Sequence, residues 1–328
     1  MSESEAVVSV SNLRTFFHSD NGVVRAVDGV NFSVHRGETL GIVGESGSGK
    51  SVACLSALGL VPRPPAYHPS GEVWYGGRDL LRCSERELEA LRGNRLAMIF
   101  QDPLTSLNPY LRISRQLTEV LEVHKGASRA EARRGAIGML ERVGIPDPAR
   151  RIDQYPHQFS GGMRQRVMIA MALLCQPEVL FADEPTTALD VTIQAQILDL
   201  IAELRRSLGT AVVLVTHDLG VVAGSTDRVA VMYAGRIVET GATEAVFARP
   251  QHPYTRGLLA STPRIDTPPG SRLDTIPGLP PDLGHLPSGC PFHPRCSRVI
   301  DRCRVEDPPL AMVSPAHASA CWNSGVTA

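Results

Sequence analysis

An eight-residue glycine-rich sequence constrains this chain more than any other feature. Residues 44–51 read Gly-Glu-Ser-Gly-Ser-Gly-Lys-Ser, which matches the G-x-x-x-x-G-K-[S/T] pattern of a phosphate-binding loop. The apolar run Thr39 to Val43 before it is typical of a buried strand, and Ser51 to Leu60 after it is typical of a helix. Such a strand–loop–helix unit predicts a nucleotide-binding α/β fold.

Each residue type in this loop has a chemical purpose. Glycines let backbone amides close around the β- and γ-phosphates, and the following helix directs its positive end toward them. Lys50 is one of only two lysines in an arginine-rich chain and supplies a compact charge, while the Ser51 hydroxyl can bind Mg²⁺. The predicted nucleotide-binding residues here are Gly44, Ser46, Gly47, Ser48, Gly49, Lys50 and Ser51.

A second apolar run, Val179 to Ala182, ends in the two carboxylates Asp183 and Glu184. Asp183 is suited to hold Mg²⁺ through water, and Glu184 is suited to polarise an attacking water. A helical pattern over 191–208 and a further apolar run, Ala211 to Thr216, follow. This alternation predicts a parallel sheet flanked by helices, whereas the alternating pattern over 5–43 predicts antiparallel strands.

The segment Phe159-Ser160-Gly161-Gly162-Met163-Arg164-Gln165-Arg166 lies between these two motifs. It resembles the signature motif of ATP-binding-cassette (ABC) ATPases, whose usual form has glutamine where this chain has Met163. The methionine variant resembles the oligopeptide and dipeptide importer branch. The resemblance covers about residues 6–249 and implies an α/β P-loop NTPase fold. That fold has a RecA-like parallel sheet core, an antiparallel β subdomain and a helical subdomain at about 103–175.

The remaining motifs of that family occur in the expected order. Gln101 resembles the glutamine that contacts Mg²⁺, Ala188-Leu189-Asp190 resembles the D-loop, and His217 resembles the histidine that contacts the γ-phosphate. Phe17 lies where the family stacks an aromatic ring on adenine. The resemblance implies that Glu184, His217, Lys50 and Gln101 serve catalysis, and that Ser51, Gln101 and Asp183 hold Mg²⁺.

In this family two cassettes pair head to tail and enclose ATP between them. Ser160, Gly161, Gly162 and Asp190 would then serve the nucleotide of the partner cassette. The implied partners are a second, similar or identical ATPase, two transmembrane permeases and an extracytoplasmic substrate-binding protein. Closure of the ATPase pair would drive transport of dipeptides or oligopeptides.

Residues 250–328 differ in composition from the body. They hold 14 of the 25 prolines and four of the seven cysteines. Gln251-His252-Pro253-Tyr254 begins a segment that resembles the C-terminal extension of the oligopeptide and dipeptide importer ATPases. We therefore expect a nucleotide-binding domain over 6–249 and a small Pro/Cys-rich domain over 250–328.

The four cysteines of this tail are Cys290, Cys296, Cys303 and Cys321, with the spacing C-x5-C-x6-C-x17-C. A disulfide pair is disfavoured in the cytosol, and structural zinc sites favour closer pairs of cysteines. Some members of the resembled branch carry a [4Fe–4S] cluster at such cysteines, so the resemblance implies one here. The alternative is four reduced thiols packed in a small fold, and the tail could also be a redox sensor.

Composition narrows the remaining classes. The formal net charge of −1 gives no basic field for nucleic acid, and the longest apolar run, Val167 to Cys175, is too short to span a membrane. The N-terminus is a poor secretory signal because no basic residue precedes its apolar stretch. We expect a peripheral protein held by its partners at the cytoplasmic face of the cell membrane. The alternatives are a soluble ABC ATPase of DNA repair, translation or iron–sulfur assembly, and an importer of another solute such as nickel.

Overall fold

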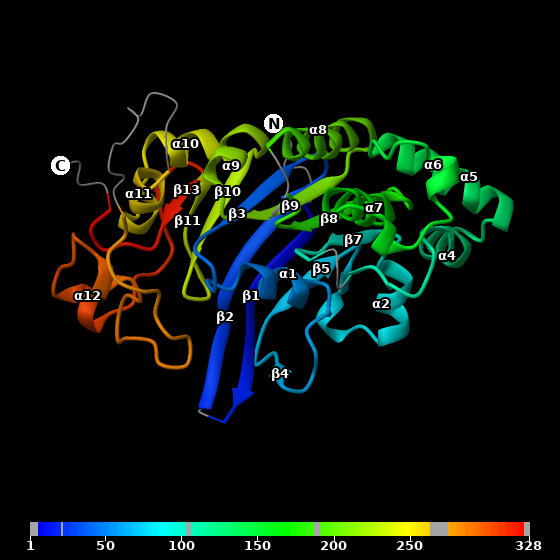
Figure 1. The fold of residues 1–328 in the computed structure, drawn as a ribbon. Helices are drawn as coiled ribbons and strands as arrows, with labels where there is room; N and C mark the ends of the chain where they lie inside the picture. Colours follow the sequence, from blue (N-terminus) through cyan, green and yellow to red (C-terminus); the bar gives the residue numbers. More distant parts are fainter. Residues whose placement is uncertain (1–5, 21, 103–105, 187–190, 263–274, 325–328) are drawn as a thin grey trace. The chain divides into compact units, whose positions relative to one another are not determined.

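The computed structural model describes residues 6–20, 22–102, 106–186, 191–262 and 275–324, with no side-chain description for residue 191. The chain divides into two compact units. The first comprises Met1–Val8, Val34–Glu38 and Arg82–Leu214, and the second comprises Ser9–Ser33, Thr39–Leu81 and Val215–Ala328. The elements are labelled in Figure 1.

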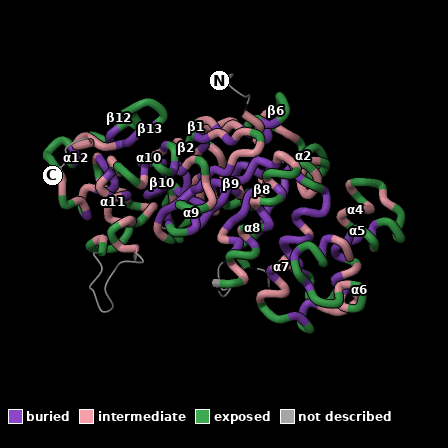
Figure 2. Tube along the Cα trace, turned by 90° about the horizontal axis from the view of Figure 1, so that it is seen from above, coloured by how far each residue is buried: buried purple, intermediate pink, exposed green. Residues whose placement is uncertain are grey.

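In the first unit, the strands have the order β9-β8-β7, and β7 pairs with β8 in parallel. Their bounds are β7 (Leu96–Ile99), β8 (Val179–Asp183) and β9 (Ala211–Thr216), which begins in this unit. Every residue of these three strands is buried, and β8 and β9 are coloured purple in Figure 2. The all-apolar runs of the sequence therefore form the central strands, as expected for strands covered on both faces.

Helix α8 occupies the range 191–208 predicted from the sequence, whereas the pattern over 112–143 is divided. Helical periodicity extends over 112–143, but the structure has two helices there, α4 (Ile113–Lys125) and α5 (Arg129–Arg142). Gly126 ends the first with φ 63°, and Ser128 begins the second with a capping box to Glu131. Helix α7 packs against β7, α4 and α5. The other helices are α2 (Glu85–Leu91), α6 (Pro148–Arg151), α7 (Gly161–Leu173) and α8 (Val191–Leu208).

In the second unit, a sheet has the order β2-β1-β5-β6. Strand β4 pairs antiparallel with β1, and β6 pairs antiparallel with β5. Strands β1 and β2 flank the Asp20-Asn21-Gly22 segment, which the sequence predicts as a hairpin turn. The strands are β1 (Ala6–Ser19), β2 (Gly22–His35), β4 (Ala66–Tyr67), β5 (Glu72–Tyr75) and β6 (Arg78–Asp79).

A second set of strands in this unit has the order β12-β13-β11-β10-β3. Strands β10 and β3 are parallel, whereas β11 pairs antiparallel with β10 and β13. The tail residues therefore extend the same sheet that carries the phosphate-binding loop. The strands are β3 (Thr39–Val43), β10 (Arg228–Tyr233), β11 (Arg236–Ala242), β12 (Ala311–Ser314) and β13 (His317–Ser319).

Some helices of the second unit pack on this sheet. Helix α9 packs on β3, and α10 packs on α9, β10 and β11. The helices are α1 (Lys50–Ala57), α9 (Leu219–Ser225), α10 (Thr243–Ala248), α11 (Pro253–Ala260) and α12 (Arg302–Val305). Helix α1 ends three residues before the predicted Leu60, and Gly59 follows with a left-handed φ of 64°. No helix among the described residues has the length and apolar character needed to cross a membrane.

Candidate nucleotide site

The predicted phosphate-binding loop connects β3 to α1, as its sequence requires. Two of its glycines occupy positions that no side chain could share. Gly44 has φ 155° and an added Cβ would lie 2.1 Å from the Met232 carbonyl oxygen. Gly49 has φ 101° and an added Cβ would lie 2.2 Å from the Ala26 carbonyl oxygen. The loop is thus pressed against β10 and β2, and only glycine permits that approach.

Lys50, the first residue of α1, reaches back across the loop. Its Nζ donates to the carbonyl oxygens of Gly44 at 2.8 Å and Glu45 at 2.9 Å, and lies 3.5 Å from Ser48 Oγ. The side chain is buried, whereas Ser46 and Gly47 are exposed and Ser51 is half-buried. A buried ammonium encircled by loop oxygens is a fixed positive charge at the place where the motif predicts phosphate.

In the first unit, two predicted catalytic residues meet. Asp183 is the buried last residue of β8, and Glu184 follows it with a left-handed φ of 47°. Gln101, two residues beyond the end of β7, donates from Nε2 to Glu184 Oε2 at 3.0 Å. Residues 83 positions apart are therefore hydrogen-bonded because β7 and β8 are parallel neighbours and both chains leave the sheet at the same edge.

The segment that resembles the signature motif begins helix α7. Ser160 is the N-cap, and its Oγ accepts from the Met163 amide at 3.3 Å. The exposed Ser160 and Gly161 and the half-buried Gly162 thus lie at the positive end of a thirteen-residue helix. Gln165 is buried and donates to the Pro185 carbonyl oxygen at 2.6 Å, which links α7 to the loop after Glu184.

The remaining predicted residues are placed as follows. Phe17 is half-buried on β1 and pairs in register with Ala66 of β4. His217 is exposed and follows β9 directly. Asp190 and the rest of its motif lie outside the described residues.

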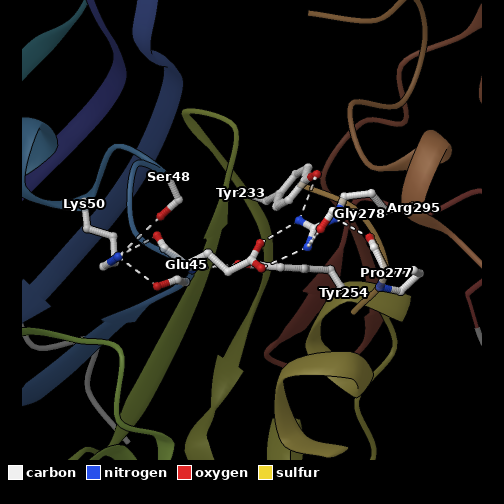
Figure 3. A network of polar contacts seen from close by, with 9 residues as sticks. Glu45, Ser48, Lys50, Tyr233, Tyr254, Pro277, Gly278 and Arg295 are labelled. Carbon is white, nitrogen blue, oxygen red and sulfur yellow. Dashed lines mark hydrogen bonds and ion pairs between the residues drawn. The ribbon is translucent and has the colours of Figure 1, made fainter. Parts of the chain in front are cut away.

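The structure adds contacts to the loop that the sequence analysis missed. Glu45 forms a two-pronged ion pair with Arg295 of the tail, with Oε2 2.7 Å from Nη1 and Oε1 2.9 Å from Nη2 (Figure 3). The Glu45 amide donates to the Tyr254 hydroxyl at 2.7 Å. Of the two tail residues, only Tyr254 belongs to the segment that the sequence indicated as the start of the extension. No local pattern relates residue 45 to a partner 250 positions away.

The four tail cysteines are free thiols. Cys290 and Cys303 lie in the hydrophobic core of the second unit, Cys296 packs against this core, and Cys321 is half-buried. Burial, with smaller contributions from the neighbouring thiols, raises the pKa of Cys290 to about 11 and also raises the pKa values of Cys296 and Cys321. Backbone amides of Arg298 and Asn323 donate to the sulfurs of Cys296 and Cys321, both at 3.4 Å. Among the described residues, however, no group of three or more His, Cys, Asp or Glu side chains is arranged to hold a metal ion. The geometry therefore does not support the predicted metal centre.

Comparison with known families agrees with these motifs. Residues 27–187 match the family model described as ABC transporter, and residues 238–303 match that of the oligopeptide/dipeptide transporter C-terminal region. A probable peptide ABC transporter ATP-binding protein of Sinorhizobium fredii is 54% identical over 322 residues, which cover 98% of this chain and 96% of the relative. The chain belongs to the ABC transporter family.

Further relatives of this ABC protein match it over nearly their full length. The oligopeptide transport ATP-binding protein OppD of Salmonella typhimurium is 52% identical, over 97% of this chain and 94% of the relative. The dipeptide transport ATP-binding protein DppD of Bacillus subtilis is 52% identical, over 97% and 95%. The dimeric ATP-binding cassette MJ0796, solved in a post-hydrolysis state with ADP and Pi, is 29% identical, with a TM-score of 0.66. That comparison covers 72% of this chain and 98% of the cassette, and the P-loop α/β fold predicted from the sequence is confirmed.

Proposed function

We propose that this chain is the ATP-hydrolysing subunit of an importer of dipeptides or oligopeptides. The observation that carries the proposal is sequence identity at about half of the aligned positions, over nearly the whole chain, with ATP-binding proteins named for peptide transport. The similarity includes the C-terminal region as well as the cassette. We also propose the cassette over 6–249 and the extension over 250–328 as the two functional domains.

We propose the roles of the individual residues from the family resemblance of their motifs together with their chemistry. Lys50 and the loop amides bind phosphates, Glu184 is the general base, and His217 stabilises the charge that develops in the transition state. Mg²⁺ neutralises phosphate charge when bound, and the oxygen donors offered for it are of the type this ion prefers. Those donors are Ser51, Gln101 and Asp183. Phe17 stacks on adenine, and Ser160, Gly161, Gly162 and Asp190 serve the nucleotide of the partner cassette.

The proposed assembly places the chain at the cytoplasmic face of the cell membrane. It contains a second ATPase subunit, two permeases and an external substrate-binding protein, with no nucleic acid. Peptide selectivity resides in those partners, because the cassette contributes ATP chemistry and motion.

The deciding experiment is reassembly of the chain in lipid vesicles with its cognate permeases and binding protein. ATP hydrolysis should rise when the binding protein is loaded with a dipeptide or oligopeptide, and labelled peptide should enter the vesicles. Stimulation by nickel ions without any response to peptides would overturn the substrate class. ATP hydrolysis that needs no permease, in a chain that never co-purifies with membranes, would overturn the transport role.

We propose, as a finer point, that the four tail cysteines bind an iron–sulfur cluster. The proposal rests on the chemistry of the donors and not on their arrangement, which forms no metal site among the described residues. The donors are four thiols, and backbone N–H groups are directed at two of the sulfurs, which is a common way of tuning these clusters. Protein purified without oxygen should absorb broadly at about 400 nm and contain iron and acid-labile sulfide. Colourless protein, with stoichiometric zinc or with four titratable thiols, would contradict the cluster.

A further inference from the structure

The tail of this ABC ATPase grips a residue of the phosphate-binding loop itself. Every polar group of Glu45 is engaged (Figure 3). Its carboxylate is paired with Arg295, its amide donates to Tyr254 Oη, and its carbonyl oxygen accepts from Lys50 Nζ at 2.9 Å. Two of these three contacts come from the C-terminal extension, and the third comes from the lysine that the motif assigns to phosphate binding.

Arg295 is itself held firmly. Its Nε donates to the Pro277 carbonyl oxygen at 2.9 Å, and its Nη2 lies 3.4 Å from the Gly278 carbonyl oxygen. The hydroxyl of Tyr233, on β10, lies 3.4 Å from Nη1. The Arg295 side chain is only 6% exposed, and the ion pair raises its pKa. Because all three guanidinium nitrogens are hydrogen-bonded, Arg295 is held in place and cannot move together with the loop.

The extension also packs closely beside the loop. Pro280, Pro281 and Leu283 line a cavity with residues 45–48 that measures about 10 Å³, which leaves room for no more than a single water. Tyr254 is fully buried and packs against Tyr233 in a tilted arrangement, with ring centroids 4.6 Å apart and an angle of 56° between the ring planes. The ion pair thus lies on a rigid, packed surface rather than on a free arm.

We propose that the extension is part of the nucleotide site, with Arg295 as a positioning residue. It fixes the carboxylate of Glu45 and, through this residue's backbone, the carbonyl oxygen that orients Lys50. The extension thereby holds the loop in its phosphate-accepting shape before ATP arrives. Preorganisation of this kind affects the affinity for ATP more than the rate of the chemical step. The inference rests on the proposed ATPase function.

The first test measures ATP binding by titration calorimetry with Mg²⁺ on the full chain. Arg295→Gln should raise the Kd for ATP about tenfold, equivalent to about 1.4 kcal/mol. Arg295→Lys should lie between this variant and wild type, because lysine keeps the charge and loses the planar fork. The matched control is Arg302→Gln, which removes an exposed pair with Glu306 in the same extension and should leave the Kd unchanged.

A double-mutant cycle separates positioning from general damage. Glu45→Gln should weaken ATP binding about as much as Arg295→Gln, and the double variant should be no weaker than either single variant, because both changes remove one interaction. In the reassembled transporter, KM for ATP should rise while kcat stays near wild type. Simple loss of folded protein would instead lower kcat and leave KM unchanged.

Several results would overturn the proposal. Folded Arg295→Gln protein that binds ATP within twofold of wild type is one, and additive effects in the cycle are another. If Arg295→Gln does not fold, Glu45→Gln alone tests the proposal. An unchanged affinity for ATP in that variant contradicts the positioning role of Arg295. A wild-type chain that binds no ATP would mean that the proposed function has failed, which is a different outcome.

Discussion

Glu184 combines a strained backbone with a specific hydrogen bond. Its φ of 47° is rare for a residue with a side chain, and its carboxylate accepts from Gln101 at 3.0 Å. If Glu184 is the general base, Glu184→Gln should bind ATP normally and hydrolyse it about 10²–10³-fold more slowly. Calorimetry and steady-state phosphate release check the two halves. Glu141→Gln, an exposed change on α5, is the control, and near-normal turnover by Glu184→Gln would remove Glu184 from that role.

His252 makes stability depend on pH. Burial lowers its pKa to about 3, and its Nδ1 accepts from the Tyr254 amide at 3.1 Å. The unfolded chain takes up this proton near pH 6.5 and the folded chain does not. The stabilisation is therefore complete above that pH and falls by about 1.4 kcal/mol per unit as pH decreases toward 3. Urea unfolding at pH 7.5 and 5.5 should show this loss in wild type and a smaller one in His252→Gln. Equal losses in both would contradict it.

Functional residues could be predicted from the sequence where they lie close together in one short motif. The phosphate-binding loop is recognisable because its glycines, lysine and serine act within eight residues. The hydrogen bond between Gln101 and Glu184 depends on strand pairing, so only a resemblance could relate the two. Glu45 occupies a variable position of the motif, and its partner Arg295 is set by the path of the tail, which no local rule describes.

Strand β13 has a buried side-chain contact with β11 in addition to its backbone pairing with β11 and β12. It has three residues, all buried, and His317 Nε2 lies 2.7 Å from Oε1 of the fully buried Glu239 on β11. Glu239 also accepts from the amides of Gln251 and His252. One carboxylate thus joins β11, β13 and the start of α11.

Removing the histidine should leave this carboxylate buried with one hydrogen-bond partner fewer. We expect His317→Ala to lower the free energy of unfolding by about 3–5 kcal/mol. Arg115→Ala, which breaks the exposed pair with Glu122 at 3.1 Å, should cost about 1 kcal/mol or less. Chemical denaturation measures both, and similar values for the two variants would show that the buried contact has no special weight.

At the scale of elements, apolar runs and strong periodicity were sufficient to predict strands and helices, whereas very short strands could not be predicted. The buried strands β3, β8 and β9 and the helix α8 lie where their runs of residues predict them. Strands β12 and β13 were missed, because a three- or four-residue strand has no periodic signal of its own. Strand β13 forms through pairing with β11, about 80 residues earlier in the sequence, and β12 forms through pairing with β13.

The second unit as a whole depends on its tail. Its core includes Tyr233 and Val238 from the cassette strands together with Tyr254, Phe292 and Cys303 from the extension. A chain that ends after Arg249 should therefore expose apolar surface and leave Glu239 without partners. We expect it to aggregate on size-exclusion chromatography and to lose a cooperative thermal transition. A chain that ends after Ser324 is the control, and a stable, monodisperse shorter chain would contradict this dependence.

The ion pair between Glu45 and Arg295 also restricts how such a chain can change during evolution. A substitution at either position alone strands a charge next to the loop, so the two positions should be inherited together, as acid with arginine or as two uncharged residues. The cassette MJ0796 is comparable to only 72% of this chain. Cassettes of that shorter kind should be free to vary at the position that corresponds to Glu45, and a survey of aligned sequences would reveal the difference.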